Sequence, residues 1–277
     1  VSGLNISMVI DFLKKRLSFR NLIINSLTAK PGSKKTGLFS KGFFLSLAAT
    51  ALPLLLWTWP EAVASEDFSE QRKRMVEIDI RGQGITDPAV LDAMLSVPRH
   101  EFTDFSYRDL SYSDRALPIT ENQTISQPYI VALMTQSARL KPGDRVLEVG
   151  TGSAYQAAVL AEIAAEVYTI EIVETLAKSA AKRLTRLGYR NVNVRHGDGY
   201  QGWQEAGPFD AILITAAAPE IPEPLADQLK LGGRMVMPLG DHRLSQDLVV
   251  LTKKKDGLHK EFITGVVFVP MTGEIRQ

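Results

Sequence analysis

The chain has 277 residues, of which 45% are hydrophobic, and its formal net charge is +1 at neutral pH. This near-neutral charge gives no general attraction to nucleic acid, and we expect no nucleic-acid partner. The absence of cysteine excludes disulfides, thiolate zinc sites and thiol nucleophiles, and the four histidines are scattered, so we expect no metal site.

The first 65 residues are expected to form an extension ahead of a globular domain over residues 66–277. Within this extension an uncharged apolar run covers residues 42–59, with Lys41 before it and the small-residue triplet Ala62-Val63-Ala64 after it. This pattern resembles a signal peptide or a membrane anchor, and it suggests contact with a membrane or with export machinery. Alternatively, translation starts further in, with Met75 as a candidate.

Helical spacing covers residues 66–81, and Asp87, followed by Pro88, is a plausible N-cap of a second helix. Residues 111–124 are polar and irregular, which predicts a loop, and helical periodicity returns over 127–140. Beyond the strand that ends at Val149, the chain alternates between helices (153–165, 174–187, 222–230) and strands (166–171, 192–196, 209–215, 234–238). Two last strand-like runs, 247–252 and 261–269, predict a hairpin. The fold class expected is α/β, a Rossmann-like doubly wound sheet with N-terminal covering helices and a C-terminal edge hairpin.

A glycine turn follows the first strand of this sheet, in the order Glu148-x-Gly150-x-Gly152. Glycines at the carboxyl end of a buried parallel strand let the backbone approach a nucleotide cofactor. A dinucleotide fingerprint would require glycine at position 155, where this chain has Tyr155. The turn therefore favours S-adenosyl-L-methionine over NAD.

Two further acidic positions agree with this cofactor. Glu171 ends the next strand, about 20 residues beyond the glycines, where a carboxylate can accept hydrogen bonds from ribose hydroxyls. Asp198 and Gly199 follow the third strand, where an acceptor for the adenine amine is expected. The alternatives are a solvated strand end for Glu171 and an ordinary turn at Asp198.

Several segments together identify a family resemblance. The stretch Gln123-Thr124-Ile125-Ser126-Gln127-Pro128-Tyr129 lies ahead of the cofactor strand, and Val97-Pro98-Arg99-His100-Glu101-Phe102 lies upstream of it. With the glycine turn, His196-Gly197-Asp198-Gly199 and Thr215-Ala216-Ala217-Ala218-Pro219, they closely resemble protein-L-isoaspartate O-methyltransferases. The resemblance runs from about residue 71 to the C-terminus.

The resemblance implies methyl transfer from S-adenosyl-L-methionine to the free α-carboxylate of L-isoaspartyl residues in damaged proteins, whose ester then closes to a succinimide. It implies that Ser126 is the active-site hydroxyl. Together with the site where the cofactor is made, it implies a cytoplasmic enzyme, with export or membrane tethering as the alternative, and we expect a monomer. The cofactor positions implied are Gln123, Thr124, Ile125, Ser126, Glu148, Gly150, Thr151, Gly152, Glu171, Ile172, Asp198 and Gly199. Thr272 and Gln277 fall on a C-terminal stretch that some relatives fold over the site.

Local alternatives and departures from the family pattern accompany this assignment. Ser126, two residues before Pro128, also fits a helix N-cap. Ala154 stands where many relatives have glycine, and we expect it inside a helix, where alanine is favourable. Asn122 replaces a glycine of the family, so its loop is either stiffer or places Asn122 at positive φ.

Two other functions remain open on the sequence alone: a related methyltransferase acting on a small molecule or RNA, and a cofactor-binding adaptor without transfer activity. No general base is expected for transfer to a carboxylate, because a carboxylate is already ionised near neutral pH. The chemistry then depends on alignment of the reacting groups.

Overall fold

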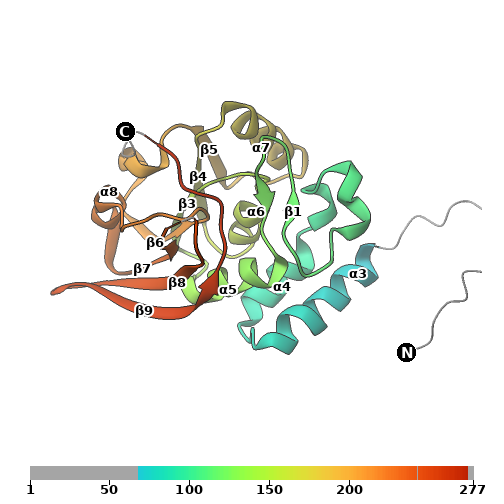
Figure 1. Ribbon diagram of the computed structural model, residues 1–277, viewed down its shortest axis with the longest axis horizontal. Helices are drawn as coiled ribbons and strands as arrows, with labels where there is room; N and C mark the ends of the chain where they lie inside the picture. Colours follow the sequence, from blue (N-terminus) through green and yellow to red (C-terminus); the bar gives the residue numbers. More distant parts are fainter. Residues whose placement is uncertain (1–67, 242, 274–277) are drawn as a thin grey trace, which may run out of the picture. The chain divides into compact units, whose positions relative to one another are not determined.

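A computed structural model describes residues 68–241 and 243–273, and its centre is a seven-stranded sheet in the order β5-β4-β3-β6-β7-β8-β9 (Figure 1). The first five strands in this order run parallel, and β8 and β9 are antiparallel additions at one edge. The strands are β3 (Arg145–Val149), β4 (Glu166–Glu171), β5 (Val192–His196), β6 (Phe209–Ile214), β7 (Leu229–Leu239), β8 (Gln246–Lys254) and β9 (Gly257–Val266). The predicted Rossmann-like sheet and its edge hairpin are therefore confirmed.

The middle strands end together at one edge of the sheet. Strand register pairs Val149 of β3 with Ile170 of β4 and with Ile214 of β6. Their short apolar runs are buried, as expected of parallel strands covered on both faces. The residues that follow these three strands consequently meet in one crevice, which is where ligands bind in open α/β sheets.

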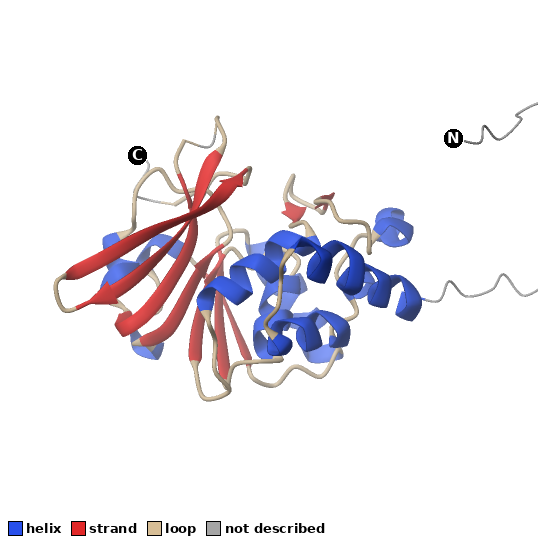
Figure 2. Cartoon of the chain, turned by 90° about the horizontal axis from the view of Figure 1, so that it is seen from below, coloured by secondary structure: helices blue, strands red, loops and turns tan. Residues whose placement is uncertain are grey.

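Helices cover the two faces of the sheet unequally (Figure 2). One hydrophobic cluster joins the sheet to α5, α6, α7 and the N-terminal helices, and a second joins its other face to η5, η6 and α8. These helices are α5 (Pro128–Ala138), α6 (Tyr155–Ala161), α7 (Glu174–Arg186), η5 (Gly199–Gln201), η6 (Gln204–Ala206) and α8 (Glu223–Asp227).

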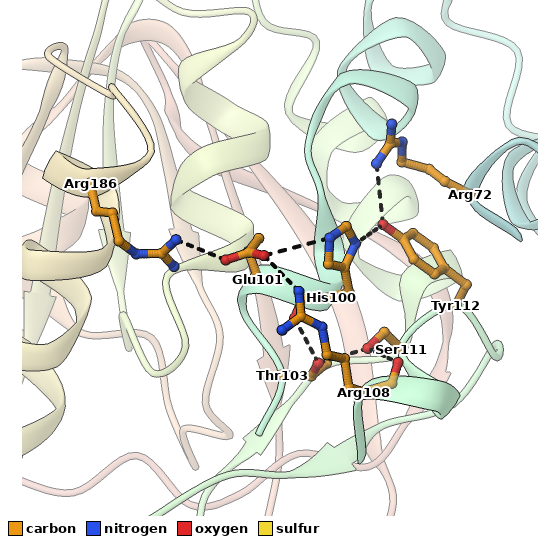
Figure 3. A network of polar contacts seen from close by, with 8 residues as sticks. All are labelled: Arg72, His100, Glu101, Thr103, Arg108, Ser111, Tyr112 and Arg186. Carbon is orange, nitrogen blue, oxygen red and sulfur yellow. Dashed lines mark hydrogen bonds and ion pairs between the residues drawn. The ribbon is translucent and has the colours of Figure 1, made fainter. Parts of the chain in front are cut away.

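The N-terminal helices form a cover, named here the helical cover, that comprises residues 68–114. It contains α3 (Phe68–Arg74), η1 (Met75–Ile80), η2 (Arg81–Gln83), α4 (Pro88–Ser96), η3 (Arg99–Glu101) and η4 (Phe105–Leu110). Asp87 caps α4 as predicted, by accepting a hydrogen bond from the amide of Ala89. Glu101 pairs with Arg186 of α7 at 2.9 Å, and this ion pair attaches the cover to the core (Figure 3).

Several element boundaries differ from the prediction. The expected helix 66–81 contains a π-helical stretch, η1, and the expected loop 111–124 contains most of a small hairpin of β1 (Leu117–Pro118) and β2 (Thr124–Ile125). The predicted helix 222–230 ends at Asp227, because Leu229 already pairs with Phe209 as part of β7. In the edge hairpin, β8 and β9 extend through most of the linker that was expected between them.

No helix among the described residues is both long enough and apolar enough to cross a membrane. The apolar run 42–59, the cleavage-like triplet and the predicted domain boundary at residue 66 lie outside the described residues, so these interpretations stay predictions.

Candidate active site

A pocket lies at the carboxyl ends of β3, β4 and β6, and it collects the residues that the sequence proposed for a cofactor. It is bordered by the glycine turn, by the β2–α5 segment and by the C-terminal segment. Every predicted site residue except Asp198 lines it, namely Gln123, Thr124, Ile125, Ser126, Glu148, Gly150, Thr151, Gly152, Glu171, Ile172 and Gly199. The lining is observed, whereas the roles of these residues remain proposals.

At two of these positions a side chain would force neighbouring atoms to move. Gly150 has φ +99°, and a Cβ there would lie 2.5 Å from Oγ1 of Thr215. A Cβ at Gly199 would overlap Cγ1 of Val149. The Thr215 hydroxyl donates to the carbonyl of Gly150 at 2.7 Å and so holds the turn from the neighbouring strand. The main chain is therefore the wall of the pocket at these points.

Ala154 does not lie inside a helix, which corrects the sequence interpretation. It precedes α6 with φ 70° and ψ 13°, in the left-handed region, and α6 begins at Tyr155. The helix is also shorter than the predicted 153–165. The glycine turn needs a left-handed residue at this point, and that requirement overrides the helical preference of alanine.

Asn122 adopts φ 55° and its neighbour Glu121 adopts φ 60°, so the positive-φ alternative for this loop is confirmed. Asn122 adopts without glycine a conformation for which the family often uses glycine, and both residues carry the local strain of a positive φ. The Glu121 carboxylate accepts a hydrogen bond from Thr175 of α7 at 2.8 Å. This contact joins the tip of the β1–β2 hairpin to the core.

Glu171 holds the glycine turn through its side chain. One carboxylate oxygen accepts from the amide of Gly152 at 2.7 Å, and the other accepts from the amide of Val173 at 3.0 Å. A carboxylate offers about four acceptor sites, so capacity remains for the hydroxyls of a ribose. The predicted ribose role is therefore compatible with the geometry, and the solvated alternative is not, because Glu171 is buried.

Glu148 is fully buried, and its two carboxylate oxygens differ in their hydrogen-bond partners. Oε2 accepts a hydrogen bond from Thr169, whereas Oε1 has no partner among the described residues. Burial, opposed by the Thr169 bond and reinforced by the charge of Glu171, raises the pKa of Glu148 to about 8. An unpaired buried acceptor on the pocket wall suits a ligand that brings positive charge or N–H donors, as S-adenosyl-L-methionine does.

Ser126 lies between β2 and α5 on a wall that the cofactor pocket shares with a second pocket. The residues common to both are Thr124, Ser126, Thr215 and Val269. The N-cap of α5 is Gln127, so the interpretation of Ser126 as the cap is wrong. Among the described residues none hydrogen-bonds to the Ser126 hydroxyl, which leaves it able to bind a ligand.

The C-terminal segment closes the pocket. The amide of Met271 donates to the carbonyl of Ala217 at 2.8 Å, and Thr272 lines the pocket as predicted. The next residue, Gly273, lies against the carboxylate of Asp198, which also accepts from the amide of Tyr200. Asp198 therefore contacts this segment and is not one of the residues that line the pocket. Gln277 is outside the described residues.

Part of the site was not predicted from the sequence. Thr215 follows β6 directly, and its place at the carboxyl end of a strand beside β3 could have identified it. Met271 and the buried Arg99, which contacts the Ser126 carbonyl, carry no local signal, because they reach the site through tertiary folding. Among the described residues no group of three or more His, Asp or Glu could hold a metal ion.

Comparison with known sequences decides the family. A family model described as protein-L-isoaspartate(D-aspartate) O-methyltransferase matches residues 70–276. A protein-L-isoaspartate O-methyltransferase of Gloeobacter violaceus is 54% identical over 200 residues, covering 72% of this chain and 98% of the relative. One from Opitutus terrae is 51% identical over 228 residues, covering 82% and 97%. The chain belongs to the protein-L-isoaspartate O-methyltransferase family.

Solved structures agree with this membership. A protein-L-isoaspartate O-methyltransferase superposes with a TM-score of 0.68 at 32% identity, covering 73% of this chain and 66% of the other. A protein-L-isoaspartate O-methyltransferase from Plasmodium falciparum, solved with S-adenosyl-L-homocysteine, has a TM-score of 0.63 at 29% identity, covering 73% and 98%. The predicted enzyme class, its activity on isoaspartyl residues and its cofactor, S-adenosyl-L-methionine, are thereby confirmed.

Proposed function

We propose that Ser126 is the residue that orients the acceptor in this enzyme: its hydroxyl holds the free α-carboxylate of an L-isoaspartyl residue in a damaged protein, at the junction of two pockets. One observation carries this proposal. Ser126 is exposed to the cofactor pocket on one side and to the adjoining pocket on the other. The adjoining pocket is bordered by residues 265–269 and Gln127, and we assign it to the isoaspartyl chain.

The chemistry requires little beyond alignment. S-adenosyl-L-methionine, when bound, supplies a methyl group already activated by a sulfonium. Glu148, Glu171 and the main chain of the glycine turn would hold that cofactor, by the unpaired oxygen, the spare acceptor sites and the close approach described above. Ser126 donates a hydrogen bond to one oxygen of the ionised acceptor and leaves the other oxygen free to react.

The decisive experiment is transfer of labelled methyl to a synthetic peptide that contains one L-isoaspartyl residue, with the same peptide containing normal aspartate as control. We expect selective labelling of the isoaspartyl peptide. Ser126→Ala should lower kcat by about tenfold to a hundredfold, because the acceptor loses its orienting donor. Ser106→Ala, at an exposed serine that lines neither pocket, is the matched control and should retain kcat.

Equal methylation of both peptides, or an unchanged kcat in Ser126→Ala, would contradict the proposed role. Saturable methylation of a small molecule or RNA, with none of the isoaspartyl peptide, would instead support the alternative acceptor class. The adaptor alternative is no longer needed, since the family and its activity are established by the comparisons.

We further propose that the enzyme acts in the cytoplasm, where its cofactor is made, and that it acts as a monomer. The run 42–59 keeps the opposite proposal open, in which the chain is exported or tethered to a membrane. Mass spectrometry of the mature N-terminus from fractionated cells distinguishes them, because cleavage before Ser65 indicates export. Gel filtration tests the monomer, and a dimer-sized peak would contradict it.

A further inference from the structure

Two residues of the helical cover bind the main chain at the Ser126 carbonyl and three residues beyond it, although neither lines the pocket. Nη2 of Arg99 donates to the carbonyl of Ser126 at 2.8 Å. One carboxylate oxygen of Asp114 accepts from the amide of Tyr129, in the first turn of α5, at 3.0 Å. The segment that carries Ser126 is therefore held at its own carbonyl and again three residues later.

Arg99 is fully buried, and among the described residues no carboxylate forms an ion pair with it. Its Nε donates to the carbonyl of Ser111 at 2.7 Å, and its guanidinium lies over the ring of Tyr155 at 4.7 Å. Burial lowers the pKa of the Arg99 guanidinium, and the nearby Tyr155 and Asp114 oppose this effect only in part. Since its hydrogen bonds go to main-chain carbonyls, the charge of Arg99 serves to fix the chain at Ser111 and Ser126.

Asp114 supplies the cap that α5 lacks. The N-cap residue Gln127 makes no side-chain capping bond, and the amide of Tyr129 is instead satisfied by Asp114 from a distant loop. The second oxygen of Asp114 accepts from the side-chain amides of Gln127 at 2.8 Å and Gln83 at 3.0 Å. The start of α5 is thus fixed by a residue 15 positions upstream of Tyr129.

Ser111, whose carbonyl binds Arg99, is itself held by further hydrogen bonds (Figure 3). The Ser111 hydroxyl contacts the Thr103 hydroxyl at 2.7 Å and the carbonyl of Arg108 at 2.6 Å. Arg108 pairs with Glu101 at 2.8 Å, and Glu101 pairs in turn with Arg186 of α7. The position of the Ser126 carbonyl is therefore tied, through Arg99, to the core of the domain.

We propose that Arg99 and Asp114 are positioning residues for methyl transfer, which hold the main chain around Ser126 so that its hydroxyl keeps the orientation that the acceptor carboxylate requires. This proposal rests on the proposed role of Ser126. Because neither residue lines the cofactor pocket, their removal should affect the chemical step and leave cofactor affinity unchanged.

The test is a double-mutant cycle on the full chain with the isoaspartyl peptide. Asp114→Ala should lower kcat by about tenfold or more, with an unchanged KM for S-adenosyl-L-methionine. In the Ser126→Ala background, Asp114→Ala should cause no further loss, because the residue acts through Ser126. Asp114→Asn keeps an oxygen for the Tyr129 amide and should recover part of kcat.

Asp87→Ala is the matched control. Asp87 caps α4 by the same kind of bond, from the amide of Ala89 at 2.9 Å, and does not contact the Ser126 segment. It should leave kcat unchanged. Calorimetric titration with S-adenosyl-L-homocysteine gives a readout independent of turnover, and the dissociation constant should be the same in Asp114→Ala and in the unaltered chain.

The results separate the two proposals. An equal loss from Asp114→Ala in both backgrounds, or the same loss from Asp87→Ala, would overturn the positioning role. A loss in Ser126→Ala with full activity in Asp114→Ala would also overturn it, while the role of Ser126 would stand. Full activity in Ser126→Ala would remove both. Arg99→Lys and Arg99→Met apply the same test to Arg99 if these variants fold. If they do not fold, the Asp114 cycle alone decides the test.

Discussion

At the scale of single residues, Glu148 combines a structural cost with a binding function. Its pKa is raised to about 8 by complete burial, with the Thr169 hydrogen bond opposing the rise and Glu171 adding to it. Between pH 4.5, the ordinary pKa of a glutamate, and about pH 8, the unfolded chain releases a proton that the folded chain keeps. The stability associated with protonated Glu148 is therefore fully present below pH 4.5 and is lost as the pH rises toward 8.

We expect Glu148→Gln to remove this pH dependence, because glutamine keeps an acceptor for Thr169 and has no charge to bury. Without added cofactor, the free energy of unfolding of the variant relative to the unaltered chain should rise between pH 5 and pH 9 by an amount on the order of 3 kcal/mol. Urea unfolding at several pH values measures it. The same exchange at exposed Glu220 is the control, and parallel curves for Glu148→Gln would contradict the expectation.

Single site residues were predictable where the signal is local. Glu148, Gly150 and Glu171 lie at the carboxyl ends of apolar strands or directly after them, and parallel topology brings such strand ends together. Ala154 was misassigned because its left-handed conformation is imposed by the glycine turn, whereas helix propensity describes only the residue itself. Asp114 could not be predicted as a cap of α5, since only the folded helical cover brings it to Tyr129.

At the scale of elements, Asp210 joins strands β3, β6 and β7 at their amino ends. The active site lies at the other end of these strands, at their carboxyl ends. The Asp210 carboxylate accepts from the amide of Arg145 at 2.9 Å and from Nζ of Lys230 at 2.7 Å. Burial disfavours the ionised form, but the Lys230 and Arg145 contacts outweigh it and lower the pKa of Asp210. This carboxylate therefore contributes stability above pH 3.8 that is lost as the pH falls through its lowered pKa.

Asp210→Asn should reduce the free energy of unfolding at pH 7 by about 1 to 3 kcal/mol, since hydrogen bonds to a charged group are lost. The difference should narrow below pH 3.8. Because β3 and β6 carry the site at their other ends, kcat should stay within about twofold of the unaltered value. Chemical denaturation and methyl-transfer assays measure both effects, with exposed Asp92→Asn as control. A large fall in kcat without loss of stability would count against this account.

The elements themselves were predictable to different degrees. The predicted bounds of β4 and β5 agree with the structure, although only β4 is a largely buried run and β5, at the edge of the sheet, has no buried residue. The α8–β7 boundary was not predictable, since the pairing of Leu229 with Phe209 is a long-range contact. The β1–β2 hairpin was not predicted for a different reason, because each of its strands has only two residues and shows no alternating pattern.

At the scale of the whole molecule, the family match and the contacts of α3 bear on how much of the chain the enzyme domain needs. A relative matches over 98% of its own length using 72% of this chain, and the family match begins at residue 70. Within the domain, Phe68 of α3 stacks on His100 at a centroid distance of 4.2 Å, and Arg72 donates to the hydroxyl of Tyr112 at 3.2 Å. These contacts connect α3 to the part of the helical cover that positions Ser111 and Arg99.

We therefore expect a chain beginning at residue 66 to retain stability and kcat, and one beginning at Met75 to lose about 2 kcal/mol of stability, since an aromatic pair and a hydrogen bond disappear. Thermal unfolding and methyl transfer on both chains test this. Phe68→Ala in the chain beginning at residue 66 should reproduce part of the loss, whereas exposed Glu70→Ala should not. If the chain beginning at Met75 were as stable as the longer one, α3 would be dispensable, and Met75 would become the stronger candidate for the natural start.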